Sequence, residues 1–95
     1  MGIQEIKEKI SPILEKYGIE KADIFGSFSR GEQTEKSDID LMVRLGRPMG
    51  IFEFMGLKED LMNTLGRDVD VVSEDSVDKF IKPYIIPDLK TVYER

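Results

Sequence analysis

The sequence contains no histidine and no cysteine. Without them the chain cannot form a Ser-His-Asp triad, a cysteine nucleophile or the common tetrahedral zinc sites, and it has no disulfide. The groups left for catalysis are carboxylates, hydroxyls, lysine, arginine, tyrosine and backbone amides. If the protein is an enzyme, we therefore expect its chemistry to depend on oxygen ligands and hard cations.

Basic residues are also in deficit, with 14 Lys and Arg against 19 Asp and Glu and a net charge of −5. This balance argues against direct binding to nucleic acid or to an anionic membrane. No apolar run approaches the roughly 18 residues of a transmembrane helix, and the first residues lack the features of a signal peptide. We expect a cytoplasmic protein whose residues 1–95 form a single domain.

Apolar residues recur at helical spacing in two segments. The first spans residues 3–17, where Pro12 either kinks one helix or begins a second one after Ser11. The second spans residues 51–65 and ends at Gly66. We expect the Met and Phe side chains of this second segment to lie in the core.

Strand patterns occur at residues 21–25, 38–43 and 67–73, and the central one alternates strictly between apolar and polar residues. Residues 27–37 are expected to form a helical turn and a loop. Residues 76–81 and the tail to residue 95 are expected to be helical. The pattern predicts an α/β chain with a small three-stranded sheet. The short link between the first two strands leaves little room for a parallel crossover.

Three polar features are predicted to converge in this fold. Gly26 and Ser27 follow the first strand, where backbone amides at a turn into a helix favour a phosphate. Asp38 and Asp40 are two apart on a strand, so their side chains share a face about 6.6 Å apart. Asp70 lies on another strand. Carboxylates gathered in this way repel one another unless cations bind between them, which points to magnesium or manganese.

Each feature also has a simpler interpretation. The Gly26-Ser27 pair alone is typical of a turn with a helix cap. Asp38 and Asp40 alone could be solvated residues or an Asp-x-Asp site of the glycosyltransferase type. Asp68 competes with Asp70 because the two share a strand face, but Asp68 lies nearer the start of the strand and is expected to be solvated.

Residues 25–32 (FGSFSRGE) and 37–43 (SDIDLMV) resemble the signature of the minimal nucleotidyltransferase (MNT) branch of the DNA polymerase β-like nucleotidyltransferase superfamily. Residues 65–72 (LGRDVDVV) resemble the place where this branch carries its third metal carboxylate. The tail from residue 81 is also similar to the end of MNT chains. The resemblance implies the minimal nucleotidyltransferase fold, with helices packed on a three-stranded mixed sheet.

The resemblance also implies site residues and cofactors. The catalytic and metal-ligating residues would be Asp38, Asp40 and Asp70, holding two Mg²⁺ ions, or Mn²⁺, with ATP as the substrate. Gly26, Ser27 and Arg30 would bind the nucleotide. Arg30 could equally be a surface residue, although a guanidinium suits a triphosphate.

The resemblance finally implies a partner. MNT proteins are typically antitoxins of HEPN toxins, so the expected reaction is transfer of AMP from ATP to a tyrosine of a HEPN protein supplied in trans. Two alternatives stay open, namely nucleotidylation of a small molecule such as an antibiotic, and a non-catalytic antitoxin that acts by contact alone. Independently of the resemblance, four apolar residues of the tail are expected to be exposed and are candidates for an interface: Tyr84, Ile85, Ile86 and Tyr93.

Overall fold

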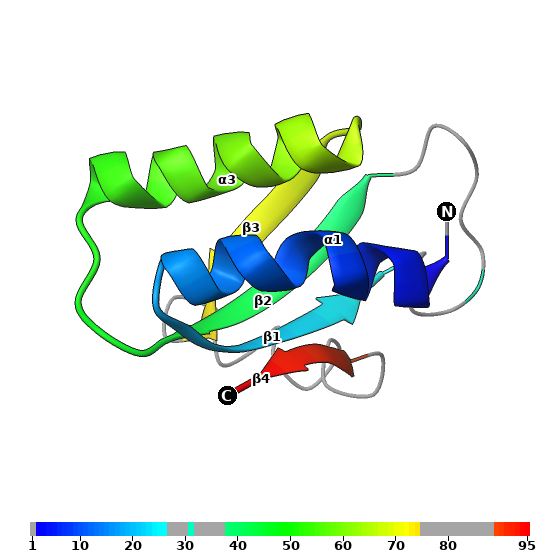
Figure 1. The fold of residues 1–95 in the computed structure, drawn as a ribbon, viewed down its shortest axis with the longest axis horizontal. Helices are drawn as coiled ribbons and strands as arrows, with labels where there is room; N and C mark the ends of the chain where they lie inside the picture. The colour runs from blue at the N-terminus through cyan, green and yellow to red at the C-terminus, as the bar shows by residue number, and fades with distance from the viewer. Residues whose placement is uncertain (1, 27–30, 32–37, 75–88) are drawn as a thin grey trace.

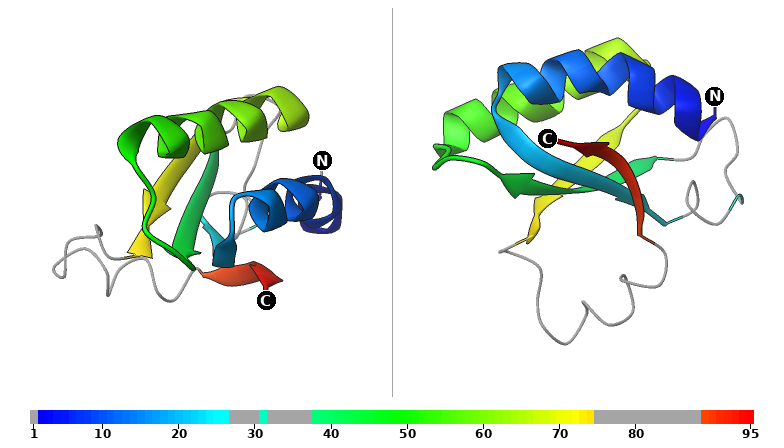
Figure 2. Two further views of the ribbon diagram at one scale, coloured as in Figure 1. Left: turned by 60° about the vertical axis from the view of Figure 1, so that its left-hand side comes forward. Right: turned by 60° about the horizontal axis from the view of Figure 1, so that its bottom comes forward.

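The computed structural model describes residues 2–26, 31, 38–74 and 89–95. Within these ranges the helices are α1 (Ile3–Lys16) and α3 (Ile51–Leu65), and the strands are β1 (Ile19–Phe25), β2 (Ile39–Leu45), β3 (Val69–Ser73) and β4 (Lys90–Glu94). Both helices lie on the same side of the sheet (Figures 1 and 2). The helical turn expected at 27–37 and the helix expected at 76–81 fall almost entirely outside the described residues.

The strand order in the sheet is β3-β2-β1-β4. Strand β1 is antiparallel to both β2 and β4, whereas β2 and β3 are parallel and α3 connects them. The predicted mixed sheet and the absence of a parallel pairing between the first two strands are therefore confirmed.

The predicted number of strands is wrong, because the tail forms β4 rather than a helix. Thr91, Val92 and Tyr93 are β-branched or aromatic, and such residues favour a strand once an edge is available for pairing. Strand β1 supplies that edge, and the register shifts between Ala22 and Asp23, where β4 carries an extra residue. The hydroxyl of Thr91 donates a 2.7 Å hydrogen bond to Oδ1 of Asp23 beside this bulge.

The core lies between the helices and the facing side of the sheet. Helical spacing brings one stripe of each helix against it, as the sequence predicts. The fully or almost fully buried side chains of the helices are Ile6, Ile10, Leu14, Leu57, Leu61 and Leu65. Those of the strands in the same cluster are Ile19, Ala22, Ile24, Ile39, Leu41, Val43, Val69 and Val92.

Helix α1 continues through Pro12, so the alternative of two short helices is wrong. Proline lacks the amide that would donate to the carbonyl four residues earlier. Ser11, the preceding residue, turns its hydroxyl onto the carbonyl of Lys7 at 2.6 Å and adds a bond within the helix.

The prediction that the Met and Phe residues of the second helix are buried is wrong at the start of α3. Ile51, Phe52 and Met55 are 71%, 86% and 58% exposed. The buried stripe of α3 begins at Leu57 and repeats at Leu61 and Leu65, and it leaves these three residues on the outward side of the helix. Within the described part of the chain, neither helix has the length and apolar character needed to cross a bilayer.

A side-chain hydrogen bond joins the C-terminal end of α1 to α3. The hydroxyl of Tyr17 donates to Oδ2 of Asp60 at 2.7 Å. Gly56 leaves room for it, since a Cβ there would lie 3.3 Å from the tyrosine oxygen. The hydrogen bond to Asp60, followed by burial and nearby negative charge, raises the pKa of Tyr17 above its ordinary value of 10.0.

We expect Tyr17→Phe to lower the free energy of unfolding by about 1 kcal/mol at neutral pH, because the hydrogen bond is lost. The pKa of Tyr17 is higher in the folded state than in the unfolded state, so its stabilisation is complete below the ordinary tyrosine pKa and is lost as the pH rises through the folded value. The gap between wild type and Tyr17→Phe should therefore shrink in alkaline buffer. Urea unfolding of both proteins at neutral and at alkaline pH measures this difference in the free energy of unfolding.

Tyr93→Phe is the matched control, because it removes the same group from a half-buried tyrosine outside this contact. A gap between wild type and Tyr17→Phe that stayed constant with pH would contradict the role given to the bond.

Candidate active site

One end of the sheet gathers the predicted site residues. Strand β1 runs towards this end and finishes at Phe25, next to Gly26. Strand β2 begins there because it is antiparallel to β1, and β3 begins there because it is parallel to β2. The last turn of α3 reaches the same end of the sheet (Figure 1).

Asp40 and Asp70 are direct register partners on β2 and β3. Neighbouring strands lie about 4.8 Å apart and successive side chains alternate between faces. The buried residues Ile39, Leu41 and Val69 belong to the core, so both aspartates point to the face that the helices do not cover. Asp40 is half-buried and Asp70 is exposed. The fold thus brings these two predicted carboxylates side by side.

Asp38 and Asp68 lie at the starts of β2 and β3. The amide of Ile39 donates a 3.0 Å hydrogen bond to the carbonyl of Asp68, which holds the two strand starts together. A pocket of about 280 Å³ lies at this point. Its lining residues are Asp38, Lys58, Met62, Asp68, Val69 and Asp70. Both Asp68 and Asp70 line this pocket, so the pocket alone does not show which of them belongs to the candidate site. The strand register favours Asp70, because Asp70 is the partner of Asp40.

Gly26 adopts a positive φ of 76°. A Cβ at this position would collide with Oδ2 of Asp40. Only glycine combines this backbone conformation with the close approach to the carboxylate. Gly26, directly after β1, is therefore close to Asp40 at the acidic start of β2. Ser27 and Arg30 lie outside the described residues, and their predicted contacts with the nucleotide stay predictions.

The donor set of Asp38, Asp40 and Asp70 suits a hard divalent cation, since all the candidate ligands are carboxylate oxygens. Among the residues that the structure describes, however, no three or more Asp, Glu, His or Cys side chains are arranged to hold a metal ion. Neighbouring carboxylates repel one another in the absence of a cation. The backbone register of Asp40 and Asp70 fits the predicted site, and the convergence of all three carboxylates stays a prediction.

Lys58 and Met62 also line this pocket, and sequence reasoning missed both. Lys58 is the single basic residue in the sequence of α3, and Met62 follows it by one helical turn. A basic residue four positions before an apolar one on a helix marks a shared face. This spacing does not reveal that the face of α3 with Lys58 and Met62 lies next to the starts of β2 and β3. That position depends on how α3 crosses the sheet.

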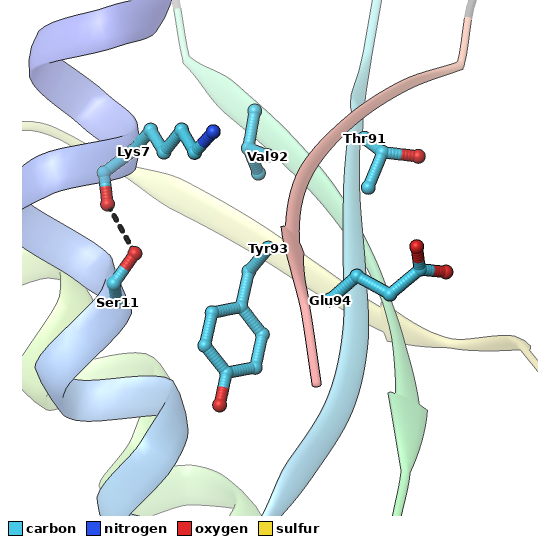
Figure 3. Close-up of a pocket in the computed structure, with 6 residues that line it drawn as sticks. All are labelled: Lys7, Ser11, Thr91, Val92, Tyr93 and Glu94. Carbon is cyan, nitrogen blue, oxygen red and sulfur yellow. Dashed lines mark hydrogen bonds between the residues drawn. The ribbon is translucent and has the colours of Figure 1, made fainter.

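A second hollow, of about 450 Å³, lies at the opposite edge of the sheet between α1 and β4 (Figure 3). Lys7 and Ser11 line it from α1, and none of the predicted site residues belongs to it. Tyr93 points from β4 towards α1 in Figure 3 and is half-buried, so it is not the exposed tail residue that the sequence suggests. Tyr84, Ile85 and Ile86 lie outside the described residues.

A small mixed sheet covered by helices on one side, with paired aspartates beside a glycine turn, defines the class of minimal nucleotidyltransferases. The chain belongs to the polymerase beta nucleotidyltransferase family, whose model matches residues 8–95.

Individual relatives agree with this assignment. A proposed protein adenylyltransferase of Methanocaldococcus jannaschii is 44% identical over 86 residues, which cover 90% of this chain and 92% of that protein. A solved structure described as a minimal nucleotidyltransferase has a TM-score of 0.80 at 27% identity and covers 95% of both chains. A crystal structure of a toxin–antitoxin with AMP-PNP has a TM-score of 0.81 at 25% identity, with 94% of this chain and 73% of that chain covered.

Gly26→Ala tests the contact between the turn and Asp40. The left-handed backbone should cost about 1–2 kcal/mol of stability, and the methyl group should also displace the Asp40 carboxylate. We expect Mg·ATP to bind at least about tenfold more weakly, which corresponds to about 1.4 kcal/mol. Isothermal titration calorimetry and urea unfolding measure the two effects.

Gly66→Ala is the matched control, because Gly66 has a φ of 69° and, apart from its own neighbours in the chain, no atom of the described residues lies within 4 Å of the added Cβ. It should show the backbone cost without the loss of Mg·ATP affinity. Equal affinities for Mg·ATP in the two variants would contradict the predicted site.

Proposed function

We propose that this chain transfers AMP from ATP, with divalent cations, to a tyrosine hydroxyl of a HEPN-type partner protein. The observation that carries the proposal is the register that makes Asp40 and Asp70 neighbours beside the Gly26 turn. Two comparisons support it: a relative 44% identical is named for protein adenylyl transfer, and a structural neighbour is a toxin–antitoxin with an ATP analogue. The HEPN character of the partner comes from the motif resemblance.

The nucleotide would bind at the turn that follows β1. Gly26 has no side chain, so a phosphate could approach the backbone there. Ser27 and Arg30 would add a hydroxyl and a guanidinium to the phosphate oxygens. The adjacent Asp40 would then lie next to the triphosphate rather than next to the base.

Asp38 and Asp40 would hold the cations that accompany the triphosphate, and Asp70 would complete the ligand set from β3. Bound Mg²⁺ or Mn²⁺ would neutralise phosphate charge and lower the pKa of the acceptor hydroxyl. Asp70 would accept the proton as the tyrosine oxygen forms its bond to the α-phosphorus. The bond between the α-phosphorus and the bridging oxygen breaks, and pyrophosphate leaves. No histidine is needed at any point.

Asp40→Asn and Asp70→Asn should each lower AMP transfer by more than about 100-fold, because even residues that only support a metal ligand commonly cost 10–100-fold. The assay uses radiolabelled ATP, Mg²⁺ and a purified HEPN-type protein, with mass spectrometry to locate the adduct. Asp68→Asn is the matched control, since Asp68 lines the same pocket but is not the register partner of Asp40.

Other results would select the alternatives. Undiminished transfer by Asp38→Asn, Asp40→Asn and Asp70→Asn would refute the catalytic assignment. Neutralisation of the partner by all of these variants, with no AMP on it even from wild type, would identify an antitoxin that acts by contact. Label on an aminoglycoside but not on protein would identify a small-molecule enzyme.

A further inference from the structure

Helix α3 carries an exposed apolar surface at its start. Among the described residues, the exposed large hydrophobic side chains are those of Ile51, Phe52 and Met55. Exposed apolar groups that adjoin one another commonly mark a binding surface, whereas scattered ones need no explanation. We call these three residues, together with Met62, the α3 surface.

The α3 surface continues along the helix. Ile51, Met55, Lys58 and Met62 occupy positions i, i+4, i+7 and i+11, which lie on one face of a helix. From the first to the last of them the helix rises about 16 Å. A hollow of about 420 Å³ follows this face, lined by Met55, Lys58, Glu59 and Met62. The α3 surface therefore includes a groove, which Met55 and Met62 line, and exposed side chains beside it.

The same face ends at the candidate active site. Lys58 and Met62 line the groove on α3 and also line the pocket that contains Asp38 and Asp70. The groove on α3 thus adjoins the pocket of the carboxylate that would accept the proton from the acceptor. Because β3 is an edge strand, a molecule that lies in the groove would reach Asp70 around the edge of the sheet.

The α3 surface and the nucleotide turn approach the paired aspartates from different sides. Gly26 follows β1, and β2 separates β1 from β3 in the sheet. Helix α3 packs against β3 and α1. A triphosphate at the turn and a second substrate on α3 would therefore meet at Asp40 and Asp70. The groove lies on the acceptor side of the reaction, and its two methionines, Met55 and Met62, provide flexible apolar side chains that suit a protein segment better than a triphosphate.

We propose that the α3 surface is the docking site of the acceptor protein and binds an apolar segment beside its acceptor tyrosine. This inference rests on the proposed function, which requires a protein acceptor. The tyrosine would enter the pocket past Lys58 and Met62, with its hydroxyl next to Asp70. A second copy of this chain would cover the same groove and block that entrance, so self-association is the competing occupant.

Met55→Glu and Phe52→Glu test the docking site. Each places a charge on an exposed position, so the fold should be retained. The KM for the purified HEPN protein should rise at least about tenfold, as expected for a central interface side chain. The kcat at saturating partner and the Kd for Mg·ATP should not change. Thr64→Glu is the matched control, because it adds the same charge to an exposed position on another face of α3.

An unchanged KM in both variants would overturn the docking site while leaving the proposed function intact. The docking site would also be overturned if sedimentation showed that the wild type is a dimer and that Met55→Glu converts it into monomers. If wild type transfers no AMP, calorimetric titration of the HEPN protein separates the two claims. If wild type binds the HEPN protein and Met55→Glu does not, the docking site is supported although the proposed function fails. If wild type and both variants bind equally, the docking site is overturned.

Discussion

The register between β2 and β3 is the constraint on which both the core and the candidate site depend. It pairs Ile39 with Val69 on the buried face and Asp40 with Asp70 on the opposite face. A slip of one residue would exchange the faces of one strand. It would carry a carboxylate into the apolar core, where an unpaired charge is very costly. The packing that stabilises the sheet therefore also sets the spacing of the two aspartates.

A parallel pair of strands requires a crossover, and α3 is that crossover. Its inner stripe, with Leu57, Leu61 and Leu65, covers the sheet. Tyr17 fastens it to the end of α1 through Asp60. With those contacts made, the remaining face of α3 is fixed in direction and ends at the strand starts that carry the acidic residues. The groove on α3 and the candidate site are thus consequences of one connection.

Local pattern was enough to predict α1, α3 and the strands β1, β2 and β3, because each shows its period within its own residues. It was not enough for β4, since Lys90–Glu94 becomes a strand only when β1 offers an edge. It was also misleading for Phe52 and Met55, because hydrophobicity does not say which face of a helix meets the sheet. Asp40 and Asp70 could each be identified as site candidates from their strands. Their pairing, and the presence of Lys58 beside them, depend on register and crossover, which no single segment encodes.

The charges at the acidic end of the sheet explain how the proposed reaction could proceed without a histidine. The pocket there is lined by Asp38, Asp68 and Asp70 and by one basic side chain, Lys58, in a chain whose net charge is −5. A triphosphate brought to this place without counterions would be repelled, since like charges a few ångströms apart interact strongly near a protein surface. Under the proposed function, divalent cations therefore have to enter with the nucleotide. Such a site would dispense with an imidazole, because the cations would lower the pKa of the acceptor hydroxyl far enough for a carboxylate to take its proton.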